Sequence, residues 1–180
     1  LYLGTFNTNR VDYVQKIASD TKLQEYVSGM AFQWEGRESL PVLRKEHPEW
    51  NYMCSESECG RGSFDWGAGE HTFELMNHYL GNGCNEYTFW NFILADNGES
   101  PWGWKRNALI RVDSKARTFT YTPEYFAVKH YSHFITKGSQ VVAYKAQGDD
   151  RMPVLVSRTP EGKYVVVAGN FKDEASPLVV

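Results

Sequence analysis

Two glutamates at the end of an apolar run are the residues best suited to chemistry. The run Asn51–Glu56 has the pattern of a buried strand, and the chain then turns through Glu58-Cys59-Gly60. In a βα barrel, the C-terminal ends of the strands carry the catalytic groups. A carboxylate there, without histidines at metal-ligand spacing, fits glycoside hydrolysis by one nucleophilic carboxylate and one acid/base. A glutamate paired with Arg61 or Arg106 at the barrel rim is an equally good interpretation of the spacing.

Aromatic residues give the second chemical signal. The 6 Trp, 11 Tyr and 10 Phe make up 15% of the chain, and most Phe and Tyr fit a hydrophobic core. Aromatic side chains on loops at strand ends more often line a ligand site, and their flat rings suit the apolar face of a sugar among other ligands. Five tryptophans stand at the ends of strand-like runs or in the segments that follow: Trp34, Trp66, Trp90, Trp102 and Trp104.

Composition excludes several classes of protein. The 180 residues, 42% hydrophobic and 23% charged, are typical of one globular domain or slightly more. A net charge of −3 argues against a nucleic-acid partner, and no apolar run approaches the roughly 18 residues of a membrane span. The chain starts without an initiator Met or a signal-peptide pattern, so we expect a piece of something longer. The compartment stays open, a secreted or periplasmic bacterial protein being one option.

The cysteines predict neither a disulfide framework nor a metal site. There are three of them, and no Cys/His spacing suggests zinc. Cys54 lies in an apolar stretch and is expected to be a packed thiol, whereas Cys59 could pair with Cys84 if their loops meet. We therefore expect no metal and no cofactor.

Strand and helix patterns alternate through the first three quarters of the chain, which predicts an α/β fold: half of an eight-unit βα barrel or a short open sheet. Leu109–Val112 and Thr118–Tyr121 predict a small hairpin. The predicted strands are Leu1–Phe6, Val27–Trp34, Asn51–Glu56 and Tyr87–Leu94, and the predicted helices are Val11–Tyr26, Ser39–His47, Gly69–Leu80 and Pro123–Ile135.

From Gln140 the pattern changes to antiparallel strands. The predicted strands are Gln140–Ala146, Pro153–Ser157 and Tyr164–Gly169, joined by turns at Gln147–Asp150 and Pro160–Gly162. A complete sandwich needs more strands, so this is part of one. We predict a barrel portion over residues 1–136 and a partial β-sandwich over 137–180.

Several segments, in order along nearly the whole chain, resemble glycoside hydrolase family 30, the glucosylceramidase-like family. The resemblance is closer to its bacterial β-glucanase and β-glucosidase branches than to the lysosomal enzyme. It implies the last four units of a (β/α)8 TIM barrel, part of an antiparallel β-sandwich, and a retaining β-glycosidase acting on a β-linked glucoside or glucan. The segments are Gly29–Glu35, Asn51–Gly60, Tyr87–Leu94, Trp102–Asn107 and Pro123–Ile135.

The resemblance also implies a catalytic residue. Glu56 falls at the position of the family's nucleophile, with Glu58 as the rival two residues on; Ser55 and Gly60 favour Glu56 in register.

Positions around the nucleophile carry implied sugar contacts. Gln33 and Trp34 fall at positions where side chains of the family form a hydrogen bond to the sugar and flank it. Trp90 falls at the position where an aromatic ring of the family stacks on the glycone. Asn107 falls at a polar contact. Glu35 stands where some members have an aromatic residue, on the leaving-group side.

The family's acid/base glutamate, which follows Asn on the fourth barrel strand, has no counterpart here, because Asn85-Glu86 precedes the last strand. We therefore expect a nucleophile without its proton donor, in a half-barrel that forms a homodimer or requires a complementing N-terminal half. The alternative is a non-catalytic carbohydrate-binding or scaffold fragment. A flavodoxin-like binding domain is disfavoured because Gly4–Asn9 makes a poor phosphate loop.

Overall fold

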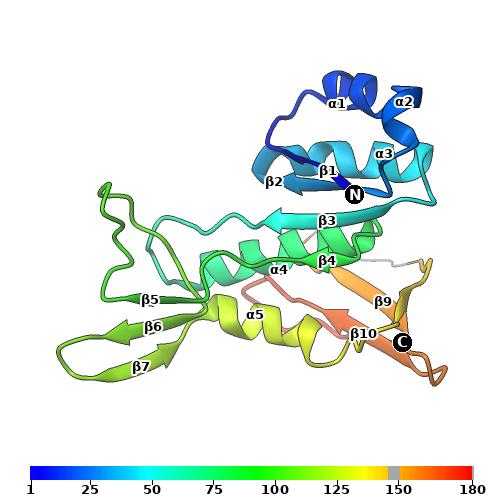
Figure 1. The fold of residues 1–180 in the computed structure, drawn as a ribbon. Helices are drawn as coiled ribbons and strands as arrows, with labels where there is room; N and C mark the ends of the chain where they lie inside the picture. The colour runs from blue at the N-terminus through cyan, green and yellow to red at the C-terminus, as the bar shows by residue number, and fades with distance from the viewer. Residues whose placement is uncertain (146–150, 180) are drawn as a thin grey trace.

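A four-stranded parallel sheet forms the centre of the N-terminal part of the molecule in the computed structural model, which describes residues 1–145 and 151–179 (Figure 1). Its strands, in spatial order, are β1 (Tyr2–Phe6), β2 (Gly29–Gln33), β3 (Asn51–Glu56) and β4 (Glu86–Tyr87). The helices between them are α1 (Val11–Ala18), α2 (Thr21–Gln24), α3 (Leu40–Glu46) and α4 (Trp66–Gly81), so the predicted α/β class is confirmed. Because the strands are parallel, their C-terminal ends lie at one edge.

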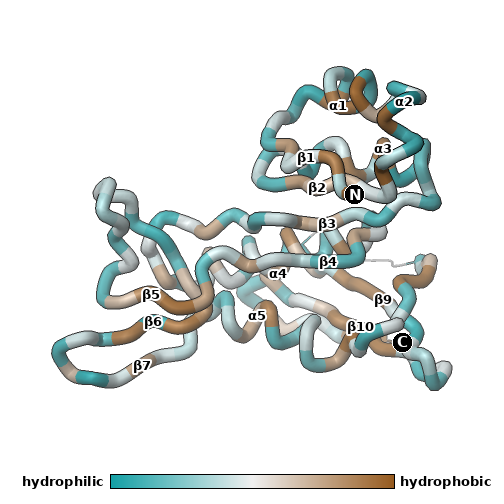
Figure 2. Tube along the Cα trace, viewed as in Figure 1, coloured by the Kyte–Doolittle hydropathy of each residue, from teal (hydrophilic) through white to brown (hydrophobic). Residues whose placement is uncertain are grey.

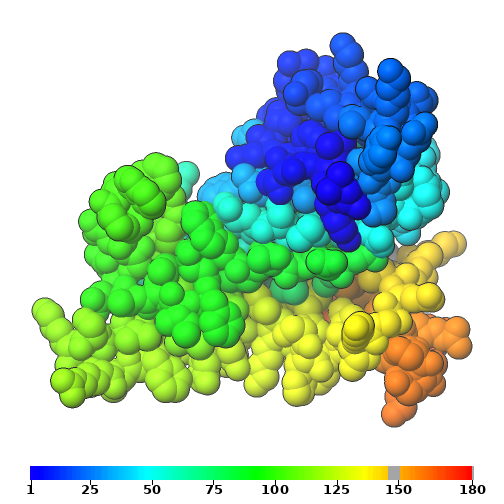
Figure 3. All heavy atoms as spheres, viewed as in Figure 1, coloured from blue at the N-terminus to red at the C-terminus, as the bar shows by residue number. Residues whose placement is uncertain are grey.

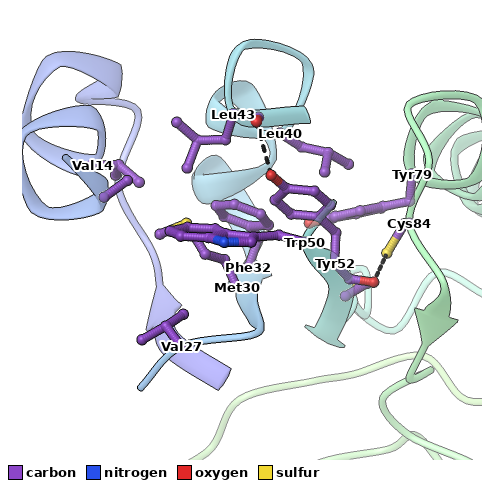
Figure 4. Packing of buried hydrophobic residues seen from close by; sticks show 12 residues of the cluster. Val14, Val27, Met30, Phe32, Leu40, Leu43, Trp50, Tyr52, Tyr79 and Cys84 are labelled. Atoms are coloured by element: carbon purple, nitrogen blue, oxygen red, sulfur yellow. Dashed lines mark hydrogen bonds between the residues drawn. The ribbon is translucent and has the colours of Figure 1, made fainter. Parts of the chain in front are cut away.

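The core of this part holds β2 and β3 against α1 and α3. Phe32 of β2 stacks on Tyr52 of β3, with ring centroids 6.2 Å apart, and both side chains are fully buried (Figure 4). The Tyr52 hydroxyl lies 2.8 Å from the Leu43 carbonyl and 2.9 Å from the His47 carbonyl, and these two acceptors share its single proton. A buried hydroxyl without a partner would be costly, so these bonds fix the end of α3 against the sheet.

Local capping explains where two helices differ from the sequence prediction. The expected helix Val11–Tyr26 is two helices, because the Asp20 carboxylate accepts from the amides of Lys22 and Leu23 and starts α2. The α4 helix begins at Trp66 rather than Gly69, since Asp65 caps it by accepting from the Ala68 amide. Among the described helices, none has the length and apolar character needed to cross a membrane.

The predicted strand Tyr87–Leu94 is wrong as a single strand. Its first part is β4, but Ile93–Ala95 is β5 of a second sheet, in which it pairs with β6 (Ile110–Asp113). The carbonyls of Asn91 and Phe92 accept from the amides of Leu109 and Ile110, so the chain leaves β3 and joins β6. The predicted hairpin is confirmed, because β6 pairs antiparallel with β7 (Thr118–Tyr121).

The C-terminal strands form a third sheet that packs on two helices. Its order is β10-β9-β8, and the buried side chains of Phe73 and Tyr131 meet Leu155 and Val167 there. Brown segments mark these strands in Figure 2, whereas the loop that joins β6 to β7 is hydrophilic. The elements are α5 (Pro123–Ser132), β8 (Gln140–Val141), β9 (Val154–Arg158) and β10 (Tyr164–Ala168).

In this region one predicted strand is shorter than expected, and one predicted boundary stays untested. The strand expected over Gln140–Ala146 is short and ends at Val141 as β8, and Ala146 with the turn Gln147–Asp150 lies outside the described residues. The division into units 1–136 and 137–180 stays a prediction.

The three cysteines are free and buried, so the pairing of Cys59 with Cys84 that the sequence left open does not form. The Cys84 thiol instead donates to the Tyr52 carbonyl at 3.2 Å (Figure 4), and burial raises its pKa to about 11. Cys54 is fully buried in the same core, as predicted for a packed thiol.

Candidate active site

Glu56 and Gln33 stand side by side at the C-terminal edge of the parallel sheet. They end β3 and β2 and are register partners, after an irregularity in pairing that follows Phe32. Glu56 is half-buried, and the indole Nε1–H of Trp34 donates to its Oε1 at 2.9 Å. The edge of the sheet thus presents a carboxylate, an amide and an indole together.

Trp34 owes its position to an unusual backbone conformation. It follows β2 directly as the first residue of a 3₁₀ helix, η1 (Trp34–Ser39), with φ of 49°. A bulky residue rarely adopts this left-handed region, and such strain gathers at functional sites. Glu35 comes next on η1 and is exposed.

Glu58 lies in a different environment from Glu56. One of its oxygens forms an ion pair with Arg37 of η1, and the other lies 2.8 Å from Nε2 of His71 on α4. Burial lowers the pKa of His71, and the Arg37 charge lowers it further. Because an ionised carboxylate only accepts hydrogen bonds, the ring donates its Nε2–H to Glu58. Both oxygens of Glu58 have partners on neighbouring elements.

The ion pairs distinguish Glu58 from Glu56. In the described part of the chain, neither Arg61 nor Arg106 forms an ion pair with Glu56, so the rim pairing considered from the sequence is not observed. Glu58 carries the ion pair instead, with Arg37.

Ser57, directly after β3, connects this strand to Trp90. Its amide donates to the Thr88 carbonyl at 3.0 Å, and its hydroxyl accepts from the Trp90 amide at 3.1 Å. Trp90 therefore stands next to the residue that follows Glu56, with its side chain partly open to solvent. Sequence analysis missed Ser57, although its place beside Glu56 was a signal.

Asn107, which the resemblance places at a polar contact, is buried. Its amide oxygen accepts from the Gly62 amide at 2.6 Å, and its Nδ2–H donates to the Glu124 carboxylate. Its backbone amide donates to the Cys59 carbonyl at 2.7 Å. A Cβ on Gly60 would lie 2.9 Å from the Asn107 side chain, so only glycine fits there. Asn107 thus fixes the loop that follows Glu56.

The exposed tryptophans fall into two groups. Trp102 and Trp104 belong to the long loop between β5 and β6, and their ring centroids lie 6.2 Å apart. Trp66 starts α4 and lines a groove of about 240 Å³ with Phe126 of α5 and Phe171 after β10. Of the residues that the sequence suggested for a ligand site, this groove contains Trp66 but none of those placed near Glu56.

No family model matches the chain, but individual proteins do. It is 28% identical to the lysosomal acid glucosylceramidase of Mus musculus over 184 residues, which cover 93% of this chain and 35% of that protein. The chain therefore spans about a third of the length of this relative.

Solved structures share the fold. SrfJ from Salmonella typhimurium superposes with a TM-score of 0.75 at 19% identity, over 87% of this chain and 36% of that one. A GH30 endoxylanase from Clostridium papyrosolvens gives a TM-score of 0.66 at 13% identity, over 93% of this chain and 40% of that one. These comparisons confirm that the chain resembles glucosylceramidase-like glycoside hydrolases of family 30 over most of its length. The preference for a bacterial branch stays a prediction.

Proposed function

We propose that the chain supplies the nucleophile side of a retaining β-glycosidase site, with Glu56 as the nucleophile. The observation that carries this proposal is the placement of Glu56 at the C-terminal edge of the parallel sheet, beside Gln33 and hydrogen-bonded by Trp34. Catalytic groups of βα barrels occupy that edge. The engagement of both Glu58 oxygens by Arg37 and His71 supports the choice between the two glutamates.

The fold part of the proposal is half of a (β/α)8 barrel. The four parallel strands β1 to β4 correspond to its last four units, and β8, β9 and β10 correspond to part of a β-sandwich. The likeness to two longer solved chains over most of this one supports this reading. In the described residues β1 and β4 are the outer strands of the sheet, each with one unpaired edge, and such edges invite pairing with another segment. A complementing half-barrel or a second copy would cover them.

In the proposed reaction the Glu56 carboxylate attacks the anomeric carbon, and the bond to the leaving oxygen breaks. A second carboxylate, about 5–5.5 Å away, gives its proton to that oxygen and then takes one from the water that cleaves the glycosyl ester. We assign this acid/base role to a residue that is not among the 180 residues of this sequence. Glu86 is a poor candidate because it starts β4, at the N-terminal end of the strand.

The proposed substrate is a β-linked glucoside or glucan. Trp90 offers a partly exposed ring for the glycone, and Trp34 forms a wall beside Glu56. We assign Gln33, whose side chain carries an amide, to a sugar hydroxyl, and the exposed Glu35 to the leaving-group side. The glucosylceramidase name of the mouse relative supports a glucoside.

Hydrolysis of an aryl β-glucoside with a good leaving group tests the proposal, because such a substrate depends least on the proton donor. We expect Glu56→Gln to abolish release of the aryl group, and Glu56→Gly with added azide to restore it by forming an α-glucosyl azide. Glu25→Gln, at an exposed position, is the matched control and should leave the rate unchanged.

The same experiment distinguishes the proposal from its alternative, a non-catalytic carbohydrate-binding or scaffold fragment. Sugar binding without any release of the aryl group would favour that alternative. Light scattering after size exclusion tests the half-barrel: we expect self-association or dependence on a complementing half, and a stable monomer of 20.7 kDa would contradict it.

A further inference from the structure

An ordered hairpin carries two of the exposed tryptophans. Glu99 and Lys105 form an antiparallel bridge, and the Ser100 amide donates to the Trp104 carbonyl at 2.8 Å. Gly103 turns the chain with φ of 76°, and a Cβ there would meet nothing within 4 Å. Internal backbone bonds therefore hold the loop in one shape, and the space around its tip is open.

The hairpin exposes its aromatic rings instead of burying them. Trp102 is 78% exposed and Trp104 is 58% exposed, with 43° between their ring planes. Large apolar side chains gathered on an ordered surface loop are typical of a binding site. In Figure 3 the green segment that contains this hairpin stands at the upper left, separated from the blue N-terminal segment by a recess.

Arg106 joins these rings to the proposed active site. Its guanidinium carbon lies 4.9 Å from the ring centroid of Trp104 and 5.7 Å from that of Trp90. Trp90, 36% exposed, is in turn bonded through its amide to Ser57, the residue after Glu56. A continuous series of contacts thus runs from the nucleophile to the tip of the hairpin.

We propose that Trp90, Trp102, Trp104 and Arg106, here called the tryptophan shelf, bind successive sugar units of a β-glucan chain. Flat rings match the apolar faces of pyranoses, and the Arg106 N–H groups suit their hydroxyls. A single glucoside would fill only the position at Trp90, whereas an oligosaccharide or polysaccharide would also reach the rings beyond it. The inference rests on the proposed function and specifies its substrate class.

Chain-length dependence tests the shelf. The probes are cello-, laminari- and gentio-oligosaccharides of increasing length, and the variant is Trp102→Ala combined with Trp104→Ala. We expect affinity for the longer members of the preferred series to fall about tenfold or more, which is about 1.4 kcal/mol. Labelling of Glu56 by a single-unit fluoro-glucoside should proceed at the wild-type rate, because that reagent does not reach the hairpin.

Three controls make the outcome specific. Trp66→Ala removes an exposed tryptophan from another surface and should change neither measurement. Trp104→Phe keeps a flat ring and should retain most of the affinity, whereas Trp104→Leu keeps apolar volume without the ring and should lose it. Equal effects on long and single-unit ligands, or none on either, would overturn the shelf. Failure of the wild-type protein to be labelled, with the complementing half present, would instead contradict the proposed function.

Discussion

The indole N–H of Trp34 donates to Oε1 of Glu56 across 2.9 Å, joining the residue that follows β2 to the last residue of β3. This bond fixes the direction of the carboxylate, because an acceptor held by one donor loses rotational freedom. The left-handed backbone of Trp34 is what turns the indole toward Glu56. This geometry suits the nucleophile role proposed for Glu56.

Replacing Trp34 with Phe keeps an aromatic wall but removes the donor. A hydrogen bond to a charged group contributes about 1.5–3 kcal/mol, so we expect the rate of covalent labelling to fall roughly tenfold or more. Labelling kinetics at several reagent concentrations separate this rate from binding. An unchanged rate with weakened binding would show that Trp34 acts only as a wall.

Glu58→Gln tests whether Glu58 has a structural role and not a catalytic one. The ion pair with Arg37 would be lost, and we expect the free energy of unfolding to fall by about 1–3 kcal/mol, measured with urea. Covalent labelling should persist. Loss of labelling at wild-type stability would instead assign the chemistry to Glu58.

His71 predicts how stability depends on pH. Its pKa is lowered in the folded protein by burial and by Arg37, so the unfolded chain binds a proton first as the pH falls. The free energy of unfolding should therefore decrease below about pH 6.5 and level off below the folded pKa. Urea midpoints from neutral to mildly acidic pH measure this, and His71→Gln should weaken the dependence. An identical dependence in that variant would rule His71 out as its source.

Asn107→Ala tests whether this residue supports the loop after Glu56. The change leaves the Gly62 amide and the buried Glu124 carboxylate without their partner, so we expect a loss of about 1–3 kcal/mol in unfolding free energy. Asn107→Asp should be worse, because it faces Glu124 with a like charge. Wild-type stability combined with lost sugar binding would restore the sugar contact implied by the resemblance.

The sequence predicted the elements that depend on local patterns. The run ending at Glu56 was a strand with the expected bounds, because alternating burial and a following turn are visible in the residues themselves. The hairpin β6–β7 and the start of α5 at Pro123 were also predictable, since turns and N-terminal prolines leave local signals.

Features set by distant partners were not predictable. The strand expected over Tyr87–Leu94 divides because Ser57 takes the Trp90 amide and β6 takes the carbonyls that follow. The difference between Glu56 and Glu58 depends on Arg37 and His71, which come from other elements. Spacing along the chain contains no information about those contacts.

Covalent trapping tests the central claim most directly. A two-deoxy-two-fluoro β-glucoside with a good leaving group forms a slowly hydrolysed ester with the nucleophile of a retaining enzyme, and peptide mass spectrometry locates the ester. The account predicts the label on Glu56 and its absence in Glu56→Gln, with Glu58→Gln still labelled. A label on Glu58, with Glu56→Gln still active, would contradict it.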